Sequence, residues 1–195
     1  MSENRELVLY YITYILSQRK CPLSQLGLAE PPIRTDGEED ERATGASPGA
    51  TSLDEVKAAL RDSVSECELR YSRAFGDLHN QLHVTPATVQ RTFESVMDEL
   101  FDSGVNWGRV VMLFAFAGAL CVECVDKEMS QLVVQIVGWV ADYLDNRIQP
   151  WIHSQGGWRR RLQERVKKWL LAGMTLLTGV TLGSLIVQKS LGGGT

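Results

Sequence analysis

The feature that most constrains this chain is the apolar run at residues 105–125, VNWGRVVMLFAFAGALCVECV. It opens with a polar corner at residues 106–109 (NWGR) and then carries no charge over residues 110–122. A membrane span needs roughly 20 apolar residues, so the uncharged part is too short to cross a bilayer. A helix that is apolar on all sides is typical of the interior of a helical protein. The run therefore predicts the central helix of an all-α bundle.

Amphipathic helices are predicted on both sides of this run, because apolar residues recur there at spacings of three and four. Ser52 begins a capping box with Glu55, and Thr85-Pro86 is a second helix start signal. The expected helices cover residues 4–18, 52–72, 74–82, 85–103 and 127–146. In the first of them the apolar face is expected at Leu7, Tyr10, Tyr11, Tyr14 and Ile15.

The segment 127–146 is expected to form an antiparallel hairpin with the central helix, joined near Asp126. Its inward residues at helical spacing are Leu132, Val133, Ile136, Val137, Val140 and Leu144. Pro150 then breaks the helical pattern, and a tryptophan-rich corner follows at residues 151–158. The predicted fold class is an all-α helical bundle around a central apolar helical hairpin, with a C-terminal transmembrane tail anchor.

The C-terminal stretch at residues 169–187 is uncharged and has the length of a transmembrane helix. Before it, residues 159–168 carry six basic side chains against Glu164 alone, which favours a cytosolic position for that segment. Only residues 188–195 would cross the membrane. The alternative is a buried C-terminal core helix, which would normally show a polar stripe. A tail anchor is therefore preferred.

The chain divides by composition into one helical domain and its appendages. Residues 22–51 are rich in Pro, Gly, Ser, Thr and acidic residues, which predicts a disordered linker. The predicted segments are an N-terminal helix (1–21), this linker (22–51), a helical bundle with a ligand groove (52–158), a basic juxtamembrane segment (159–168), the transmembrane anchor (169–187) and a short tail (188–195).

Motifs for catalysis or metal binding are weak in this sequence. Cys121 and Cys124 form a C-x-x-C pair on the apolar helix, but no second pair completes a zinc site. The four cysteines follow no disulfide framework, so reduced thiols and a cytosolic face are expected. His79 and His83 lack the glutamate of a zinc protease motif and are interpreted as surface histidines. We therefore expect no enzyme, no cofactor, no metal, no catalytic residue and, at a formal net charge of −4, no nucleic-acid partner.

Arg109 is the residue of the corner that a helix cap does not explain. A buried, unpaired guanidinium is costly, so Arg109 is expected at a surface or beside a carboxylate. More helices have broad apolar faces than a single compact core needs, which suggests an exposed apolar groove. Such a groove takes an amphipathic helix, and Arg109 at its rim would pair with an acid on that helix.

These residues resemble a known family. The first homology motif of the B-cell lymphoma (Bcl) family of apoptosis regulators is similar to residues 105–109 (VNWGR), 118–123 (GALCVE) and 126–129 (DKEM). Its second motif resembles residues 150–152 (PWI) with 156–158 (GGW). The end of its third motif resembles residues 68–71 (ELRY) with 73–75 (RAF), and its fourth resembles residues 5–8 (RELV) with 16–18 (LSQ). The prosurvival Bcl-x type is the closest.

The resemblance implies a groove that captures the short death-motif helix of proapoptotic relatives. It implies that Arg109 pairs with the ligand's aspartate, that Gly108 lets the ligand backbone approach, and that Asn106 hydrogen-bonds nearby. The expected partner-binding residues are Tyr71, Phe75, Leu78, Val96, Met97, Glu99, Leu100, Asn106, Trp107, Gly108, Arg109, Met112 and Phe116.

Two departures from the family pattern bear on the role. The third motif has leucine, three residues, then a small residue and aspartate, whereas here Leu60 is followed by Val64 and Ser65. This loss should make the chain a poor ligand for other grooves, which favours a receptor over a killer. The second departure is that residues 159–161 (RRR) replace the family's acidic cap and short helix after Trp158.

The expected function is that of a prosurvival inhibitor of apoptosis, which sequesters death-motif helices at the cytosolic face of the mitochondrial outer membrane. The endoplasmic reticulum membrane and the cytosol are further expected locations, and the lipid bilayer is a partner through the anchor. A homodimer is a further possible assembly. The alternative is a membrane-permeabilising executor of the same fold, because the apolar hairpin could insert into a bilayer.

Overall fold

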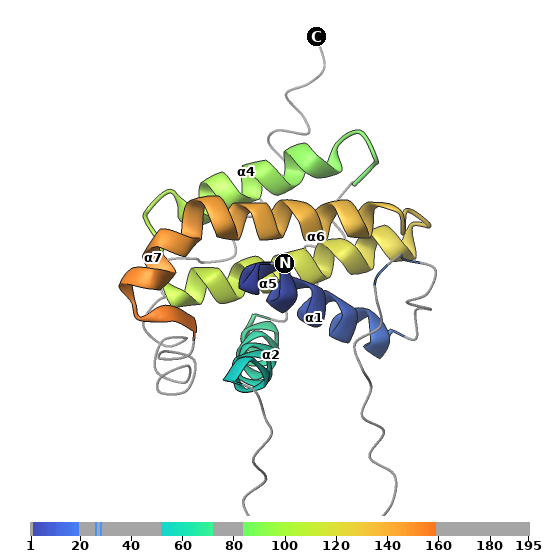
Figure 1. Ribbon diagram of the computed structural model, residues 1–195. Coiled ribbons are helices and arrows are strands. Elements are labelled where there is room, and N and C mark those ends of the chain that lie inside the picture. The colour runs from blue at the N-terminus through green and yellow to red at the C-terminus, as the bar shows by residue number, and fades with distance from the viewer. Residues whose placement is uncertain (1, 20–25, 27, 29–51, 72–83, 159–195) are drawn as a thin grey trace, which may run out of the picture.

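The computed structural model of the chain describes residues 2–19, 26, 28, 52–71 and 84–158 (Figure 1). Regular structure in these ranges is entirely helical, so the predicted all-α fold is confirmed for them. The elements are α1 (Glu3–Gln18), α2 (Ser52–Arg70), α4 (Val89–Phe101), α5 (Trp107–Asp126), α6 (Leu132–Tyr143), the π-helical turn η2 (Leu144–Ile148) and α7 (Gln149–Ser154). The predicted helix at 74–82, the basic segment 159–168, the anchor 169–187 and the tail 188–195 lie outside the described residues.

Helix α5 is the centre of the bundle, as the apolar run predicts. Every residue from 107 to 118 is buried, and α1, α2, α4 and α6 pack around the helix (Figure 1). By length and composition α5 alone among the described helices is able to cross a membrane, but most of it is buried inside the bundle. That burial is what a core helix requires.

Helices α5 and α6 form the predicted antiparallel hairpin and run side by side through the molecule (Figure 1). All six residues of the expected inward face of α6 are buried. The helix begins at Leu132, five residues later than expected, because the chain first turns through Lys127, which caps α5, and Glu128, whose φ is 59°.

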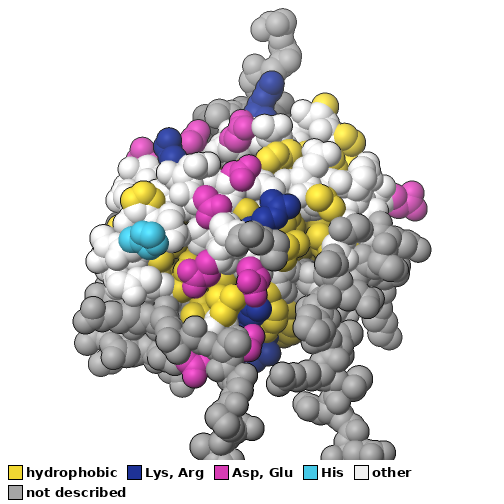
Figure 2. Space-filling view, in the orientation of Figure 1, with side chains coloured by type: hydrophobic (Ala, Val, Ile, Leu, Met, Phe, Trp, Pro, Cys, Tyr) yellow, Lys and Arg dark blue, Asp and Glu magenta, His cyan; other side chains and the backbone are white. Residues whose placement is uncertain are grey.

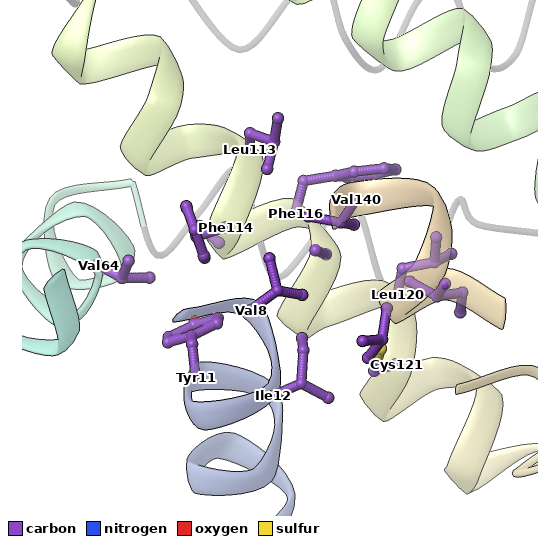
Figure 3. Packing of buried hydrophobic residues seen from close by; sticks show 14 of the residues in the cluster. Val8, Tyr11, Ile12, Val64, Leu113, Phe114, Phe116, Leu120, Cys121 and Val140 are labelled. Atoms are coloured by element: carbon purple, nitrogen blue, oxygen red, sulfur yellow. The ribbon is translucent and has the colours of Figure 1, made fainter. Parts of the chain in front are cut away.

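Helix α1 packs against α5 through Leu7, Val8, Tyr11, Ile12 and Leu16, of which Figure 3 labels three together with their α5 neighbours. This buried stripe is rotated relative to the sequence prediction. Tyr10 and Tyr14 are instead half-buried under two cations of α2. The Nζ atom of Lys57 lies 5.6 Å from the Tyr10 ring centroid, and the guanidinium carbon of Arg61 lies 5.6 Å from that of Tyr14. The α1–α2 contact is therefore partly a cation–π interface.

The start of α4 and the place of Pro150 also differ from the prediction. Helix α4 begins at Val89, after a turn in which the Thr85 carbonyl accepts from the N–H groups of Thr88 and Val89, each at 3.0 Å. Pro150 does not interrupt the chain's helical course, since η2 leads directly into α7 and the proline occupies the first turn of α7. A proline is tolerated there because the N–H that it lacks has no partner within the helix.

Two residues of the predicted linker are described, and both are buried. Leu26 is 4% exposed and Leu28 is 6% exposed, and both belong to the hydrophobic core. These two leucines of the predicted linker therefore belong to the core of the bundle.

Candidate partner-binding site

The polar corner before α5 is held by a side-chain cap. The Asn106 side-chain oxygen accepts from the backbone N–H of Arg109 at 2.9 Å, which gives one of the first N–H groups of the helix a partner. Gly104, in the connection from α4, has a φ of 97°, which glycine adopts without strain. Together these residues turn the chain sharply from α4 into α5 and place Arg109 in the first turn.

Arg109 lies in neither of the two settings that the sequence favours. It is 9% exposed, and its Nη1 donates to the Gly104 carbonyl at 2.5 Å. Among the described residues its buried Nε has no hydrogen-bond partner, and no carboxylate there forms an ion pair with the guanidinium. The guanidinium is thus desolvated with its charge uncompensated within the described part of the chain, an arrangement that is costly.

The apolar residues expected to line the groove belong to one continuous cluster of buried side chains. Those on α4 and α5 are each 7% exposed or less: Val96, Met97, Leu100, Met112 and Phe116. Glu99 is exposed, Asn106 and Tyr71 are half-buried, and Gly108 is buried. Phe75 and Leu78 lie outside the described residues. The predicted lining residues of α4 and α5 are therefore part of the bundle's hydrophobic core and are covered in this conformation.

Large apolar side chains are seldom exposed on the described surface. Leu69 on α2 and Val134 on α6 are the two exposed examples among the described residues, at 79% and 41%. On the face that carries α1, Figure 2 shows small apolar areas interspersed with acidic and basic side chains.

An aromatic cluster surrounds Trp107, the first residue of α5. Its ring centroid lies 5.0 Å from that of Trp151 and 5.5 Å from that of Trp158. Trp158 in turn meets Phe114 edge-on at 6.1 Å, and Phe114 meets Tyr11 at 5.8 Å. The Trp107 Nε1 is buried and finds no partner in the described part of the chain. The first turn of α5 thus carries two buried N–H donors that lack a partner there, Trp107 Nε1 and Arg109 Nε.

A buried polar junction beside this cluster was not predicted from the sequence. The Asn4 side chain of α1 is 2% exposed and bonds to Asp145, Gln149 and the indole N–H of Trp158. The spacing in the sequence could have indicated that Asn4 is buried, because Asn4 precedes Leu7 and Val8 by three and four residues and so falls on the buried stripe of α1. The partners are more than 140 residues away along the chain, which no periodicity reveals.

The cysteines behave as buried apolar residues. Cys67, Cys121 and Cys124 are free thiols that are fully buried. Burial, with a smaller effect of Glu123, raises the pKa of Cys124 to about 11. Burial and then Glu68 raise the pKa of Cys67 to about 12, and burial raises that of Cys121 well above its ordinary value. Within the described ranges no three His, Cys, Asp or Glu side chains are grouped to hold a metal ion; His79 and His83 lie outside them.

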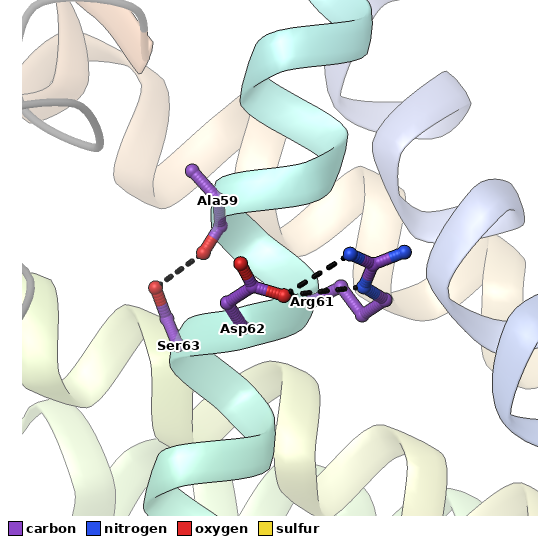
Figure 4. A network of polar contacts seen from close by, with 4 residues as sticks. All are labelled: Ala59, Arg61, Asp62 and Ser63. Atoms are coloured by element: carbon purple, nitrogen blue, oxygen red, sulfur yellow. Dashed lines mark hydrogen bonds and ion pairs between the residues drawn. The ribbon is translucent and has the colours of Figure 1, made fainter.

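Helix α2, which carries the altered third motif, turns its apolar stripe into its own bundle. Leu60, Val64 and Cys67 are each 1% exposed or less. Ser63 is also buried, and its hydroxyl donates to the Ala59 carbonyl at 2.5 Å (Figure 4). Asp62, the residue before Ser63, is exposed to solvent and pairs with Arg61 at 3.2 Å (Figure 4).

Comparison with known proteins places these features in a family context. A model described as apoptosis regulator proteins of the Bcl-2 family matches residues 60–158, and a model of Bcl-2 homology region 4 matches residues 2–19. Bcl-2-like protein 1 of Homo sapiens is 42% identical, with 95% of this chain and 98% of that protein aligned. Apoptosis regulator R11 of Xenopus laevis is 39% identical over 91% of this chain and 93% of its own length. Apoptosis regulator Bcl-2 of Gallus gallus is 39% identical over 80% of this chain and 77% of its own length.

Proposed function

The chain belongs to the Bcl-2 family of apoptosis regulators, and from this membership we propose that it is a prosurvival inhibitor of apoptosis. It acts without catalysis, by sequestering the amphipathic death-motif helix of proapoptotic relatives. The high identity to Bcl-2-like protein 1 over nearly the whole of both chains supports this assignment. The match to Bcl-2 homology region 4 at residues 2–19 supports it further, because this chain carries that region together with the Bcl-2 family domain.

The observation that carries the proposal is the buried guanidinium of Arg109. An unpaired buried N–H donor costs about 1–3 kcal/mol, more when the group is charged. A carboxylate delivered by a ligand helix removes that cost and accepts from the Nε of Arg109. The Arg109 site is therefore suited to an acidic side chain held on an otherwise apolar helix.

The remaining affinity comes from the apolar anchors of the ligand, at roughly 1.5–3 kcal/mol for each large side chain before ordering costs. Val96, Met97, Leu100, Met112 and Phe116 supply the complementary apolar surface. Because these residues are covered here, a ligand binds a conformation in which they are uncovered, and part of its binding free energy is spent on that change.

The chain is the receptor in this interaction rather than the donor of a helix. A donor must release an apolar helix from its own fold, whereas the apolar stripe of α2 is buried in the bundle. A death-motif helix also needs an acid after its small residue, and here Val64 is followed by Ser65. Both observations support sequestration over killing.

The proposal places the protein at the cytosolic face of the mitochondrial outer membrane and of the endoplasmic reticulum. The uncharged segment 169–187, preceded by the basic segment 159–168, supports a tail anchor in the lipid bilayer.

Binding of a fluorescent death-motif peptide to the full chain in detergent micelles tests the proposal. We expect tight binding to the wild type and a loss of about 2–5 kcal/mol on Arg109→Ala, since the ligand carboxylate is then stranded. The peptide whose aspartate is changed to alanine should lose about as much, and the two changes together should cost less than their sum.

The matched control is Arg91→Ala, which removes the same charge from an exposed position on α4 and should leave the affinity unchanged. Circular dichroism verifies that both variants keep their helices. Equal affinities of wild type and Arg109→Ala, with helicity intact, would remove Arg109 from the site.

A further inference from the structure

Asn4 joins the N-terminal helix to the far end of the chain. Its Nδ2 donates to Asp145 Oδ1 and to Gln149 Oε1, each at 2.6 Å, and its Oδ1 accepts from Trp158 Nε1 at 2.8 Å. Asn4 is 2% exposed and Trp158 is also 2% exposed. Both N–H groups and the oxygen of the carboxamide are therefore engaged, and the Trp158 indole has a defined partner inside the protein.

Trp158 connects this junction to the corner that carries Arg109. Its ring contacts those of Phe114 and Trp107, with centroid distances of 6.1 and 5.5 Å. Trp107 is the first residue of α5, and Arg109 follows two residues later on the same helical turn. Because packed aromatic rings move together, the orientation of the Trp158 indole limits where the first turn of α5 can lie.

The Trp158 indole depends on Asn4 for its orientation. A buried indole N–H without an acceptor is unfavourable, and Asn4 Oδ1 is the acceptor observed. Asp145 and Gln149 fix the carboxamide in turn, so the junction constrains α1, η2, α7 and Trp158 against one another. Such a fully bonded buried network holds one arrangement and disfavours others.

We propose that Asn4 is a positioning residue for the Arg109 end of the binding site, acting through Trp158 and Trp107. The N-terminal helix then regulates that site: when its first turn is displaced, Trp158 loses its acceptor and the first turn of α5 shifts. The claim that ligand affinity changes rests on the proposed function, whereas the Asn4–Trp158–Trp107 link does not.

The test uses the full chain in detergent micelles, labelled with ¹⁵N at tryptophan and arginine. In Asn4→Ala the indole resonances of Trp158 and Trp107 and the backbone amide of Arg109 should all shift. Affinity for a fluorescent death-motif peptide should fall about five- to tenfold, the effect of one lost buried hydrogen-bonded group.

A side-chain exchange provides the rescue. Asn4→Asp alone places two carboxylates together at the junction and should disturb Trp107 as Asn4→Ala does. Adding Asp145→Asn restores a donor opposite an acceptor, while the carboxylate introduced at position 4 keeps an oxygen for the Trp158 N–H. The double variant should therefore recover the wild-type Trp107 resonance and affinity. Failure to recover either would contradict positioning through the carboxamide.

Leu16→Ala is the control for a general loss of stability, because Leu16 is fully buried near the other end of α1. It should lower the melting temperature at least as far as Asn4→Ala, yet leave the Trp107 indole and the peptide affinity unchanged. An equal loss of affinity in Leu16→Ala would overturn the proposal.

The resonance and binding measurements separate the two hypotheses. If wild type does not bind the peptide, sequestration fails, and the Trp107 and Arg109 resonances of Asn4→Ala still decide the link. If wild type binds but Asn4→Ala shifts Trp158 without moving Trp107 or Arg109, the link is refuted and the proposed function stands.

Discussion

Gly118 of α5 lies directly against Tyr11 of α1. A Cβ atom built there would lie 3.0 Å from Tyr11 Oη and 3.1 Å from Tyr11 Cε1. Tyr11 cannot easily withdraw, since it is 1% exposed and packs edge-on against Phe114. We therefore expect Gly118→Ala to lower the free energy of unfolding by about 1–3 kcal/mol through overpacking, less the helix propensity gained by alanine. Urea unfolding monitored by circular dichroism measures it.

Gly138 provides the matched control for this substitution. It lies inside α6, and a Cβ atom there would meet nothing within 4 Å. Gly138→Ala should raise the free energy of unfolding by about 0.5–1 kcal/mol, because alanine favours the helix and no side chain is displaced. If Gly118→Ala is as stabilising as Gly138→Ala, the contact with Tyr11 does not constrain the core.

The buried thiols give the stability of the protein a defined dependence on pH. Folding holds the pKa of Cys67 near 12 and that of Cys124 near 11, against an ordinary value of 9.0. Between these values the folded chain binds more protons than the unfolded chain, so its stability is complete below about pH 9 and declines as the pH rises. The midpoint of urea unfolding should therefore be lower at pH 10.5 than at pH 8.

The variant Cys67→Ala isolates the contribution of one thiol. It should reduce the difference in unfolding midpoint between pH 8 and pH 10.5, because one group no longer changes its protonation on unfolding. An unchanged difference in Cys67→Ala would show that this thiol does not contribute to the alkaline loss of stability.

At the scale of single elements, the start of α5 depends on its Asn106 cap. Asn106→Ala removes the acceptor of the Arg109 backbone N–H and should cost about 1 kcal/mol of stability. Asn106→Asp keeps an acceptor at the same position and should retain most of the stability. Thermal unfolding of the two variants distinguishes them, and equal melting temperatures would mean that the cap is dispensable.

The end of α6 and the π turn that follows it contact two different helices, α4 and α1. Tyr143, at the end of α6, packs against Phe93 and Phe101 of α4, with ring centroids 6.4 and 5.6 Å apart. Asp145, in the π turn that follows, accepts from Asn4 of α1. The wider π turn thus lies between the contacts with α4 and those with α1, and π turns are frequent at functional sites.

At the scale of the whole molecule, the bundle encloses a helix that is apolar enough for a membrane. Release of α5 would expose the core that it shares with α1, α2, α4 and α6, so the folded protein should not permeabilise bilayers. We expect no dye release from liposomes by the chain alone, and suppression of the release caused by a proapoptotic executor. Release by the chain alone at neutral pH would favour the executor hypothesis instead.

The sequence by itself determined the helical class, the central helix and the hairpin. Asn106 marks the start of α5 because its cap is a local hydrogen bond, and the inward face of α6 follows from spacing alone. The corner of residues 106–109 also identified Arg109 as the residue in need of a partner, which stays a prediction for the ligand-bound state. Such features depend on neighbours within a few positions in the chain, and a sequence displays those directly.

Only the tertiary structure decided which polar groups are buried and what they contact. Asn4 and Trp158 are separated by 154 positions and bond because the first turn of α1 meets the start of α7, at Gln149, and Trp158 itself. The buried stripe of α1 is rotated because α2 covers Tyr10 and Tyr14 with Lys57 and Arg61. Arg109 is 9% exposed, although the hydrogen bond of its guanidinium to Gly104 spans only five positions. Burial is set by whichever distant element packs over a residue, and local sequence carries no record of that element.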